Sequence, residues 1–443
     1  MIAPRGRTLR VLVLMLAGAI VWLALAPAAS AHVVPTSSIQ LLVHEDEIDA
    51  AVAIPLSDLQ DSTGTTLESQ ADVDAQSEQL QQYLLAHFTP TSDDGQAWDV
   101  GMGSLTVSTT GNKATTGLYE QVQTTFTLTP PAGSEHESFN LGYDAVVDRV
   151  ATHTVIVTAR TENDDSVRTV GTVRRSTVTN KVQPLHVDLT ATSGFSAMFS
   201  LGVQHIREGT DHQLFLLTLL LPAPLLAVGR RWTGVAPAQR AVHRIAAITL
   251  SFTLGHSLTL ALGTLGAPVP QQLVESLIAV SILVAALHAV RPLFAGREAL
   301  VAGAFGLVHG LAFSEALREL DLTGAQLAWS LLGFNLGIEA MQLLVVVLVL
   351  PPLIVLARSG RYAVARNAAA ALTAVAALGW LADRLGAANP VAEVADQLGV
   401  LALPGLIVLW SVAAVLVVQA QQKQRTGDPG EPGTRESQLD HVS

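Results

Sequence analysis

The chain has no cysteine, and few of its residues are charged. The lack of cysteine excludes disulfides, thiolate zinc sites and iron–sulfur clusters. Any metal must therefore be held by nitrogen or oxygen donors, which suit Ni, Co, Zn, Cu(II), Mn or Fe(II) better than Cu(I). Only 14% of the 443 residues are charged and 49% are hydrophobic, whereas about a quarter are charged in soluble proteins. Because the apolar excess lies in the first 30 residues and after residue 195, the composition predicts a membrane protein with one soluble domain.

The amino terminus has the pattern of a secretory signal peptide. Three arginines precede an apolar run from Val11 to Ala26, and Ala29-Ser30-Ala31 fits a cleavage site. We expect residues 1–31 to be removed; the alternative is an uncleaved signal anchor. After cleavage, the α-amino group and the imidazole of His32 could chelate a metal ion. The other interpretation is that the first residue of the mature chain has no such role.

Residues 32–192 are predicted to form an exported, β-sandwich-like domain. Short alternating runs such as 39–44, 123–129 and 154–158 are typical of strands, and 71–88 has a helical pattern. Acidic residues outnumber basic ones here. One interpretation is that this charge keeps an exported domain soluble, and the other is that it raises the local cation concentration. His44 and the acidic residues after it are a candidate cation cluster, but consecutive strand residues point to opposite faces. The net charge of the whole chain is −12, and we expect no nucleic-acid partner.

Residues 193–420 are predicted to form an all-α bundle of about seven transmembrane helices. Each apolar segment is near the roughly 20 residues that cross a bilayer. The segments span 196–221, 242–263, 271–290, 299–316, 327–356, 363–382 and 397–420. The arginine-rich loops all fall on one side, which is therefore cytoplasmic. This predicts a multi-pass plasma-membrane protein with its exported domain outside and a disordered cytoplasmic tail over 421–443.

Several predicted spans carry polar side chains that the bilayer should exclude. Ionisable groups are costly in hydrocarbon, so their presence there indicates a functional site. On one continuous helix His205, Glu208 and His212 would share a face. The predicted metal ligands are His205, Asp211, His212, His256, His309 and Glu339, and the predicted supporting residues are Glu208, Ser257, Asn335 and Gln342. For His309 taken alone, the alternative is a core residue hydrogen-bonded to Asn335.

Four polar motifs in order along the chain resemble the HupE/UreJ family, in particular its branch with an exported N-terminal domain. They are His205-x5-Asp211-His212, Phe252-Thr-Leu-Gly-His256-Ser, Phe305-Gly-Leu-Val-His309-Gly and Phe334-Asn-Leu-Gly-Ile-Glu339. The resemblance covers residues 196–356 and implies a nickel or cobalt permease of the kind associated with hydrogenase and urease maturation. The larger nickel–cobalt permease family has four residues between its His and its Asp-His, not five, so no role is carried over from it.

The leading hypothesis is a permease for a divalent transition-metal ion. His205 and Glu208 would capture the ion, and a midplane site of the other predicted ligands would pass it inward. Nickel or cobalt is expected as the substrate, with zinc and copper left open. The alternative is an intramembrane zinc hydrolase that uses the same His and carboxylate cluster, with Ser257 or Glu339 assisting. A third hypothesis is a metal sensor or assembly protein whose exported domain binds another protein.

Overall fold

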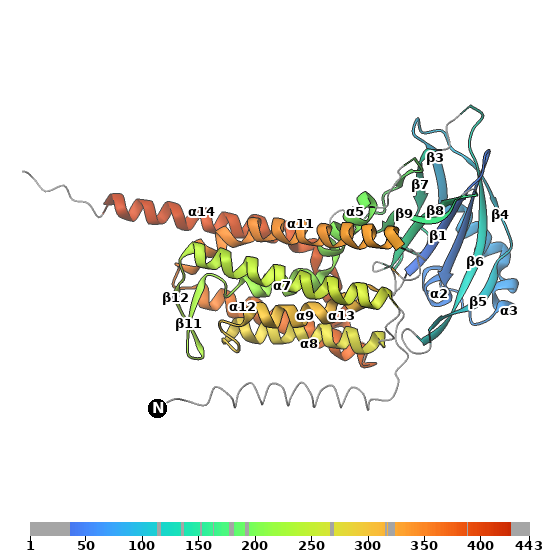
Figure 1. The fold of residues 1–443 in the computed structure, drawn as a ribbon. Coiled ribbons are helices and arrows are strands. Elements are labelled where there is room, and N and C mark those ends of the chain that lie inside the picture. Colours follow the sequence, from blue (N-terminus) through green and yellow to red (C-terminus); the bar gives the residue numbers. More distant parts are fainter. Residues whose placement is uncertain are drawn as a thin grey trace, which may run out of the picture.

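The computed structural model describes residues 36–426, apart from 113–116, 134–136, 151–152, 163, 177–180, 191–194, 266–269, 315–316, 318–323 and 388. The predicted signal peptide, His32 and most of the predicted tail lie outside the described residues. A β-rich region comes first in the chain, and a bundle of apolar helices follows it (Figure 1).

The β-rich region contains two sheets. The larger has the order β4-β6-β2-β1-β8-β9, with β5 also paired to β6, and the smaller has the order β10-β7-β3. The strands are β1 (Thr36–Val43), β2 (Ile48–Pro55), β3 (Phe88–Ser92), β4 (Asp99–Met102), β5 (Thr106–Asn112), β6 (Gly117–Thr129), β7 (Ser138–Tyr143), β8 (Thr154–Thr161), β9 (Asp164–Arg174) and β10 (Leu185–Asp188). Most neighbours are antiparallel, but β1 and β8 run parallel.

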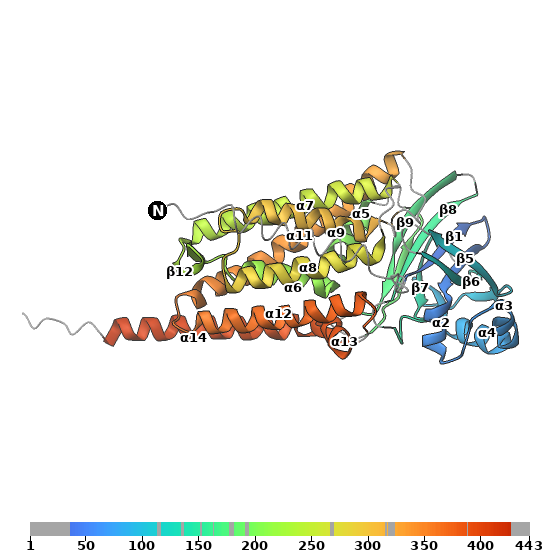
Figure 2. The same ribbon diagram turned by 90° about the horizontal axis from the view of Figure 1, so that it is seen from below.

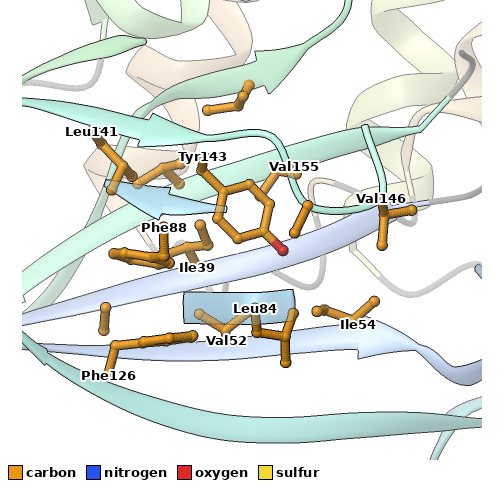
Figure 3. Close-up of a cluster of buried hydrophobic side chains, with 14 of the residues drawn as sticks. Ile39, Val52, Ile54, Leu84, Phe88, Phe126, Leu141, Tyr143, Val146 and Val155 are labelled. Atoms are coloured by element: carbon orange, nitrogen blue, oxygen red, sulfur yellow. The ribbon is translucent and has the colours of Figure 1, made fainter. Parts of the chain in front are cut away.

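The two sheets pack face to face over one apolar core. Alternate residues of the larger sheet, such as Ile39 and Val52, meet Phe88 and Tyr143 of the smaller sheet (Figure 3). The β-rich character that the alternating runs predict is therefore confirmed. The predicted helical insertion is present as α3 (Gln70–Ala75) and α4 (Ser77–Ala86), whereas α2 (Leu56–Thr63) was not predicted. That helix has two short turns and buries only two leucines, so its periodicity is weak.

The second half of the chain is helical. Its helices are α5 (Phe195–Glu208), α6 (Thr210–Leu220), α7 (Ala238–Thr264), α8 (Gln271–Val290), α9 (Glu298–Ala312), α11 (Gly324–Ala357), α12 (Tyr362–Arg384), α13 (Pro390–Asp396), the 3-10 helix η1 (Gln397–Leu401) and α14 (Ala402–Thr426). Within the described residues, five of them are long and apolar enough to cross a membrane: α7, α8, α11, α12 and α14. Several membrane-spanning helices are thus confirmed, while a total of seven crossings stays a prediction.

The first predicted span is not one helix. It consists of α5 and α6, and Gly209 between them has an extended backbone conformation with φ −70° and ψ 99°. A Cβ at this position would lie 2.6 Å from the carbonyl oxygen of His205, so only glycine fits without a shift. The backbone N–H of His212 donates to Asp211 Oδ1 at 2.8 Å, a side-chain bond that satisfies a free donor in the first turn of α6.

Glycines bring two helix pairs into backbone contact. A Cβ at Gly202 of α5 would overlap the carbonyl oxygen of Phe334 on α11, and one at Gly337 would overlap that of Phe199. The same relation holds between α9 and α7, where Gly306 faces the Phe252 carbonyl. Small residues permit such close approach between helices in a membrane. As a result, the helices that carry most of the predicted ligands pack tightly against one another.

The β-rich region lies at one end of the helical bundle, beside the start of α5 (Figures 1 and 2). The hairpin of β11 (Leu225–Val228) and β12 (Arg231–Val235) lies at the opposite end, near the carboxyl end of α11. This arrangement agrees with the prediction that the β-rich region and the arginine-bearing hairpin lie on opposite sides of a membrane. The orientation in the cell stays a prediction.

Candidate metal site

Three histidines from three helices converge inside the bundle. His205 of α5, His212 of α6 and His256 of α7 each offer a ring nitrogen, and these nitrogens lie within 4.8 Å of one another. We call these three residues the histidine cluster. Among the residues that the structure describes, it is the one group of three or more His and carboxylate side chains with this spacing. The cluster is part of the predicted ligand set.

The break at Gly209 is what brings the first two histidines together. On a straight helix, His205 and His212 would be separated by about 10 Å along the axis. In the structure their ring centroids are only 4.5 Å apart. Both residues were predicted as ligands because they would share one helix face, and the structure pairs them through a turn of the chain instead.

His256 has no hydrogen-bond partner for either ring nitrogen among the described residues, although its side chain is fully buried. Asn335 lies beside it without a hydrogen bond of regular geometry, and the side-chain oxygen of Asn335 is also buried and unpartnered. Buried polar groups in folded proteins are nearly always paired, because an unpaired one costs about 1–3 kcal/mol. A neutral imidazole has a lone pair on one ring nitrogen only, so a cation bound to that nitrogen of His256 would remove part of the cost.

Asp211 holds the ring of His212. Its Oδ1 lies 2.9 Å from Nδ1 of His212, so the carboxylate accepts the Nδ1 proton and leaves Nε2 with a free lone pair. A carboxylate in this place is typical of histidines that bind metals, because it fixes the ring and raises its basicity. Asp211 was predicted as a ligand, and in this arrangement its carboxylate supports His212.

His309 of α9 lies next to His212 rather than in the cluster. Nε2 of His309 is hydrogen-bonded to the Ser281 hydroxyl of α8 at 2.9 Å. Nδ1 of His309 lies 3.3 Å from Nε2 of His212, a hydrogen bond in which His309 donates when Nε2 of His212 carries the lone pair. A metal ion that bound both nitrogens would replace this hydrogen bond.

That separation matches a metal site. In a tetrahedral site with metal–nitrogen distances of about 2.0–2.1 Å, neighbouring nitrogens are about 3.3–3.4 Å apart. The partners of His309 are Ser281 and His212, so the alternative bond from His309 to Asn335 is wrong. Ser281 was not predicted, because one serine in an apolar helix gives no signal in the sequence.

Glu339 of α11 is tied to α7, one turn away from the cluster. The Thr253 hydroxyl lies 2.6 Å from Oε2 of Glu339 and 3.2 Å from Oε1 of Gln342. Thr253 precedes His256 by three residues, about 4.5 Å along the helix axis. The structure thus places Glu339 and Gln342 together, as predicted from their spacing. Thr253 was not among the predicted residues.

One predicted supporting residue, Ser257, has other surroundings, and the side chain of a second is not described. Ser257 donates to the Thr253 carbonyl of its own helix at 2.7 Å, a bond that serves the helix alone. Glu208 is the last residue of α5, and its side chain is outside the described part of the structure.

The candidate cation cluster of the β-rich region does not converge. Glu162 lies 2.6 Å from Nδ1 of His44 and Asp49 lies 3.2 Å from Nε2, so the carboxylates flank opposite sides of the ring. The hydrogen bond to Glu162 is the main reason that the pKa of His44 is raised. This group is a set of ion pairs that joins His44, just after β1, to Glu162, just after β8, and to Asp49 on β2.

Fold and site together define a multi-pass membrane protein in which histidines from several helices lie close enough to hold a metal ion without cysteine. Residues 181–384, which include α5 to α12, match the HupE / UreJ protein family. The resemblance in the four motifs is therefore confirmed for this part of the chain, and the match implies transport of a metal ion. No curated protein matches the chain.

Proposed function

We propose that this protein is a permease that carries a divalent transition-metal ion, nickel or cobalt, across the cell membrane, with the histidine cluster as its substrate site. The observation that supports this most is the convergence of three imidazoles from three helices, of which His212 and His256 are buried and His205 is partly buried. Of these, His256 has both ring nitrogens unpartnered within the described residues. Family membership supports the same class of substrate.

The ion would move by exchange of ligands. It would first bind to the histidine cluster. It would then pass to the pair of His212 and His309, whose facing nitrogens are 3.3 Å apart. Glu339, held by Thr253, would supply a carboxylate one helical turn further along α7. Conduction needs sites that bind well enough to admit an ion and weakly enough to release it, and sites that share a ligand meet this condition.

The ligands of the proposed site are neutral imidazoles, and this ligand type does not select one metal. Nitrogen donors suit nickel, cobalt, zinc and copper, and copper is usually bound most tightly. The family, and not the ligands, therefore favours nickel or cobalt. With the β-rich region outside the cell, the ion would enter beside it and leave towards the hairpin of β11 and β12.

Uptake of radioactive nickel and cobalt by cells that express the full chain tests the proposal. We expect wild type to accumulate one of these metals and His256→Ala to lose the accumulation at equal protein level. His212→Ala and Glu339→Gln should lose it as well. The matched control is His243→Ala, an exposed histidine of the same helix that bonds only to its own backbone turn. Wild-type cells without uptake, or full uptake by His256→Ala, would overturn the proposal.

A zinc hydrolase is the second candidate, because three histidines can also hold a catalytic zinc with an open fourth position. The two residues predicted to assist hydrolysis argue against this candidate. The Ser257 hydroxyl is hydrogen-bonded to the Thr253 carbonyl, and the Glu339 carboxylate is hydrogen-bonded to the Thr253 hydroxyl. Tightly bound, stoichiometric zinc in the purified protein, together with no uptake of any metal, would favour this enzyme.

A further inference from the structure

One end of the helical bundle joins three connections into a single surface. They are the hairpin of β11 and β12, the turn between α8 and α9, and the turn between α11 and α12. The indole N–H of Trp232 on the hairpin donates to the carbonyl oxygen of His288, near the end of α8, at 3.0 Å. The Tyr362 hydroxyl at the start of α12 donates to the carbonyl oxygen of Leu221, just before the hairpin, at 2.6 Å. We call the surface made by residues 221–244, 288–298 and 357–367 the arginine end.

The arginine end has almost no negative charge of its own. Its exposed arginines include two in each connection, namely Arg230 and Arg231, Arg291 and Arg297, and Arg358 and Arg361. Its one carboxylate is Glu298, which is 7% exposed and lies 4.0 Å from Arg244. Within the described part of the chain, none of these exposed guanidinium groups is paired with an acidic side chain. A surface of this kind attracts anions.

One arginine of this surface is buried without a counter-ion. Arg366 of α12 is only 7% exposed. Its guanidinium donates to the side-chain oxygen of Asn367 at 3.1 Å and 3.4 Å, and among the residues that the structure describes it has no carboxylate partner. A buried charge is costly unless an opposite charge compensates it. The tendency of positive loops to stay on one side of a membrane does not account for a buried arginine, which needs an anion as its partner.

Exposed apolar side chains stand beside these arginines. Val364 lies between Arg361 and Arg366 on α12 and is 71% exposed, and Val290 directly precedes Arg291 and is 42% exposed. Four helices that begin or end at this surface (α7, α8, α11 and α12) are long and apolar enough to cross a membrane. At the edge of a bilayer, acyl chains cover apolar side chains while the headgroups meet the arginines. The mixture of positive charge and exposed apolar surface therefore favours a phospholipid over a soluble acidic protein.

The type of basic residue points to a phosphate group as the anion. Every basic residue of the arginine end apart from its histidines is an arginine, and the chain has no lysine between Lys181 and Lys423. A guanidinium presents two parallel N–H donors to one phosphate, whereas an ammonium acts as a point charge. The phosphodiester of a phospholipid has two free oxygens that such a pair of donors can bind.

We propose that the arginine end binds the phosphate of an anionic phospholipid, with Arg366 as the inner contact and Arg361 at the rim. The headgroup supplies the anion that Arg366 lacks, and the acyl chains cover Val364. The site is separate from the histidine cluster and does not depend on metal transport. It lies at the end of the bundle opposite the β-rich region (Figure 1).

Thermal melting of the purified full chain in a neutral detergent tests this site. The protein is titrated with dioleoyl phosphatidylglycerol, with dioleoyl phosphatidylcholine, whose headgroup has no net charge, and with sodium phosphate. We expect phosphatidylglycerol to raise the melting temperature to a plateau, with a half-saturating concentration at least about tenfold below that of phosphatidylcholine, because several arginines attract its charge. Sodium phosphate at the same concentrations should have no effect. Equal behaviour of the two lipids, or a shift by phosphate equal to that by phosphatidylglycerol, would overturn the proposal.

Substitutions locate the site. Arg366→Gln and Arg361→Gln should each raise the half-saturating concentration of phosphatidylglycerol at least about threefold, since each removes one positive charge. Arg366→Lys keeps the charge without the paired donors and should fall between wild type and Arg366→Gln. The matched control is Arg149→Gln, an equal change of charge at an exposed arginine of the β-rich region, which should keep the wild-type value.

Arg361 is exposed, so its replacement should leave the fold intact and decide the question even if Arg366→Gln does not fold. A wild-type half-saturating concentration in Arg361→Gln would refute the site. A different occupant would be the last segment of the chain, residues 427–443, which carries four acidic residues. If phosphatidylglycerol stabilises only a variant without this segment, the segment occupies the arginine end and the lipid proposal is wrong.

Discussion

Replacement of Asp211 by Asn should weaken metal binding without disturbing the fold. Asn keeps the size of the side chain and has an oxygen that can accept the Nδ1 proton of His212. In the wild-type protein, the carboxylate of Asp211 lies 2.9 Å from this nitrogen. The replacement removes the negative charge that makes the opposite nitrogen of the ring a strong donor to a metal. Loss of a carboxylate in this relation to a ligand histidine typically costs 10–100-fold in affinity, or about 1.4–2.7 kcal/mol.

A second Asp–His pair in the same chain provides the control. Asp144 lies 2.6 Å from Nδ1 of His87 in the β-rich region, remote from the histidine cluster. Titration of the purified protein with Co²⁺, followed by visible absorbance, should show weaker binding for Asp211→Asn and wild-type binding for Asp144→Asn. Equal affinity in Asp211→Asn and wild type would refute the role given to Asp211. Equal weakening in both variants would show a general loss of stability instead.

Three further predictions concern the ion pair, the helix packing and the carboxylate of α11. The pKa of His44 is raised, so its bond to Glu162 should stabilise the fold at acidic pH and cease to do so as pH rises through that pKa. The variant Glu162→Gln should therefore lower the melting temperature at acidic pH only. Gly306→Ala should destabilise the protein by about 1–3 kcal/mol in detergent melts, because the new methyl group would overlap the α7 backbone. Thr253→Val should reduce metal uptake severalfold, since the Glu339 carboxylate loses its donor at 2.6 Å.

Each of these predictions has a matched control. Glu45→Gln changes a neighbouring exposed charge and should not alter the pH dependence of melting. Gly405→Ala should leave the melting temperature unchanged, because no described atom lies within 4 Å of the added methyl group. Thr264→Val removes a hydroxyl that bonds only within α7 and should keep wild-type uptake. The physical reason given for a prediction is wrong if its control changes as much as its variant.

The elements of this protein are largely predictable from local pattern. Alternating runs predict strands because the two faces of a sheet meet different surroundings. The predicted runs at 123–129 and 154–158 lie within strands, and the run at 39–44 lies in β1 except for its last residue, His44. Long apolar segments predict α7, α8, α11, α12 and α14 because a bilayer demands about 20 apolar residues. The short helix α2 escaped prediction, since eight residues carry too little periodicity.

The candidate site was predictable in its residue types but not in its geometry. Buried imidazoles and carboxylates in apolar segments indicate a site on energetic grounds alone, and His205, His212 and His256 do come together. The partners Ser281 and Thr253 gave no signal, because hydroxyl residues are common in apolar helices and bond readily to their own backbone.

The sequence by itself determined that this chain is a membrane protein with a β-rich part, that any metal ligands are nitrogen and oxygen donors, and that its polar motifs resemble the HupE/UreJ family. These features depend on composition and on spacing along the chain. Tertiary structure decided which side chains meet. The break at Gly209 turns His205 back onto His212, backbone contact at glycines brings α7 and α9 together, and β9 contacts α5 through the bond from Thr172 to Gln204. Such contacts join residues far apart in sequence, and no local pattern encodes the distance between them.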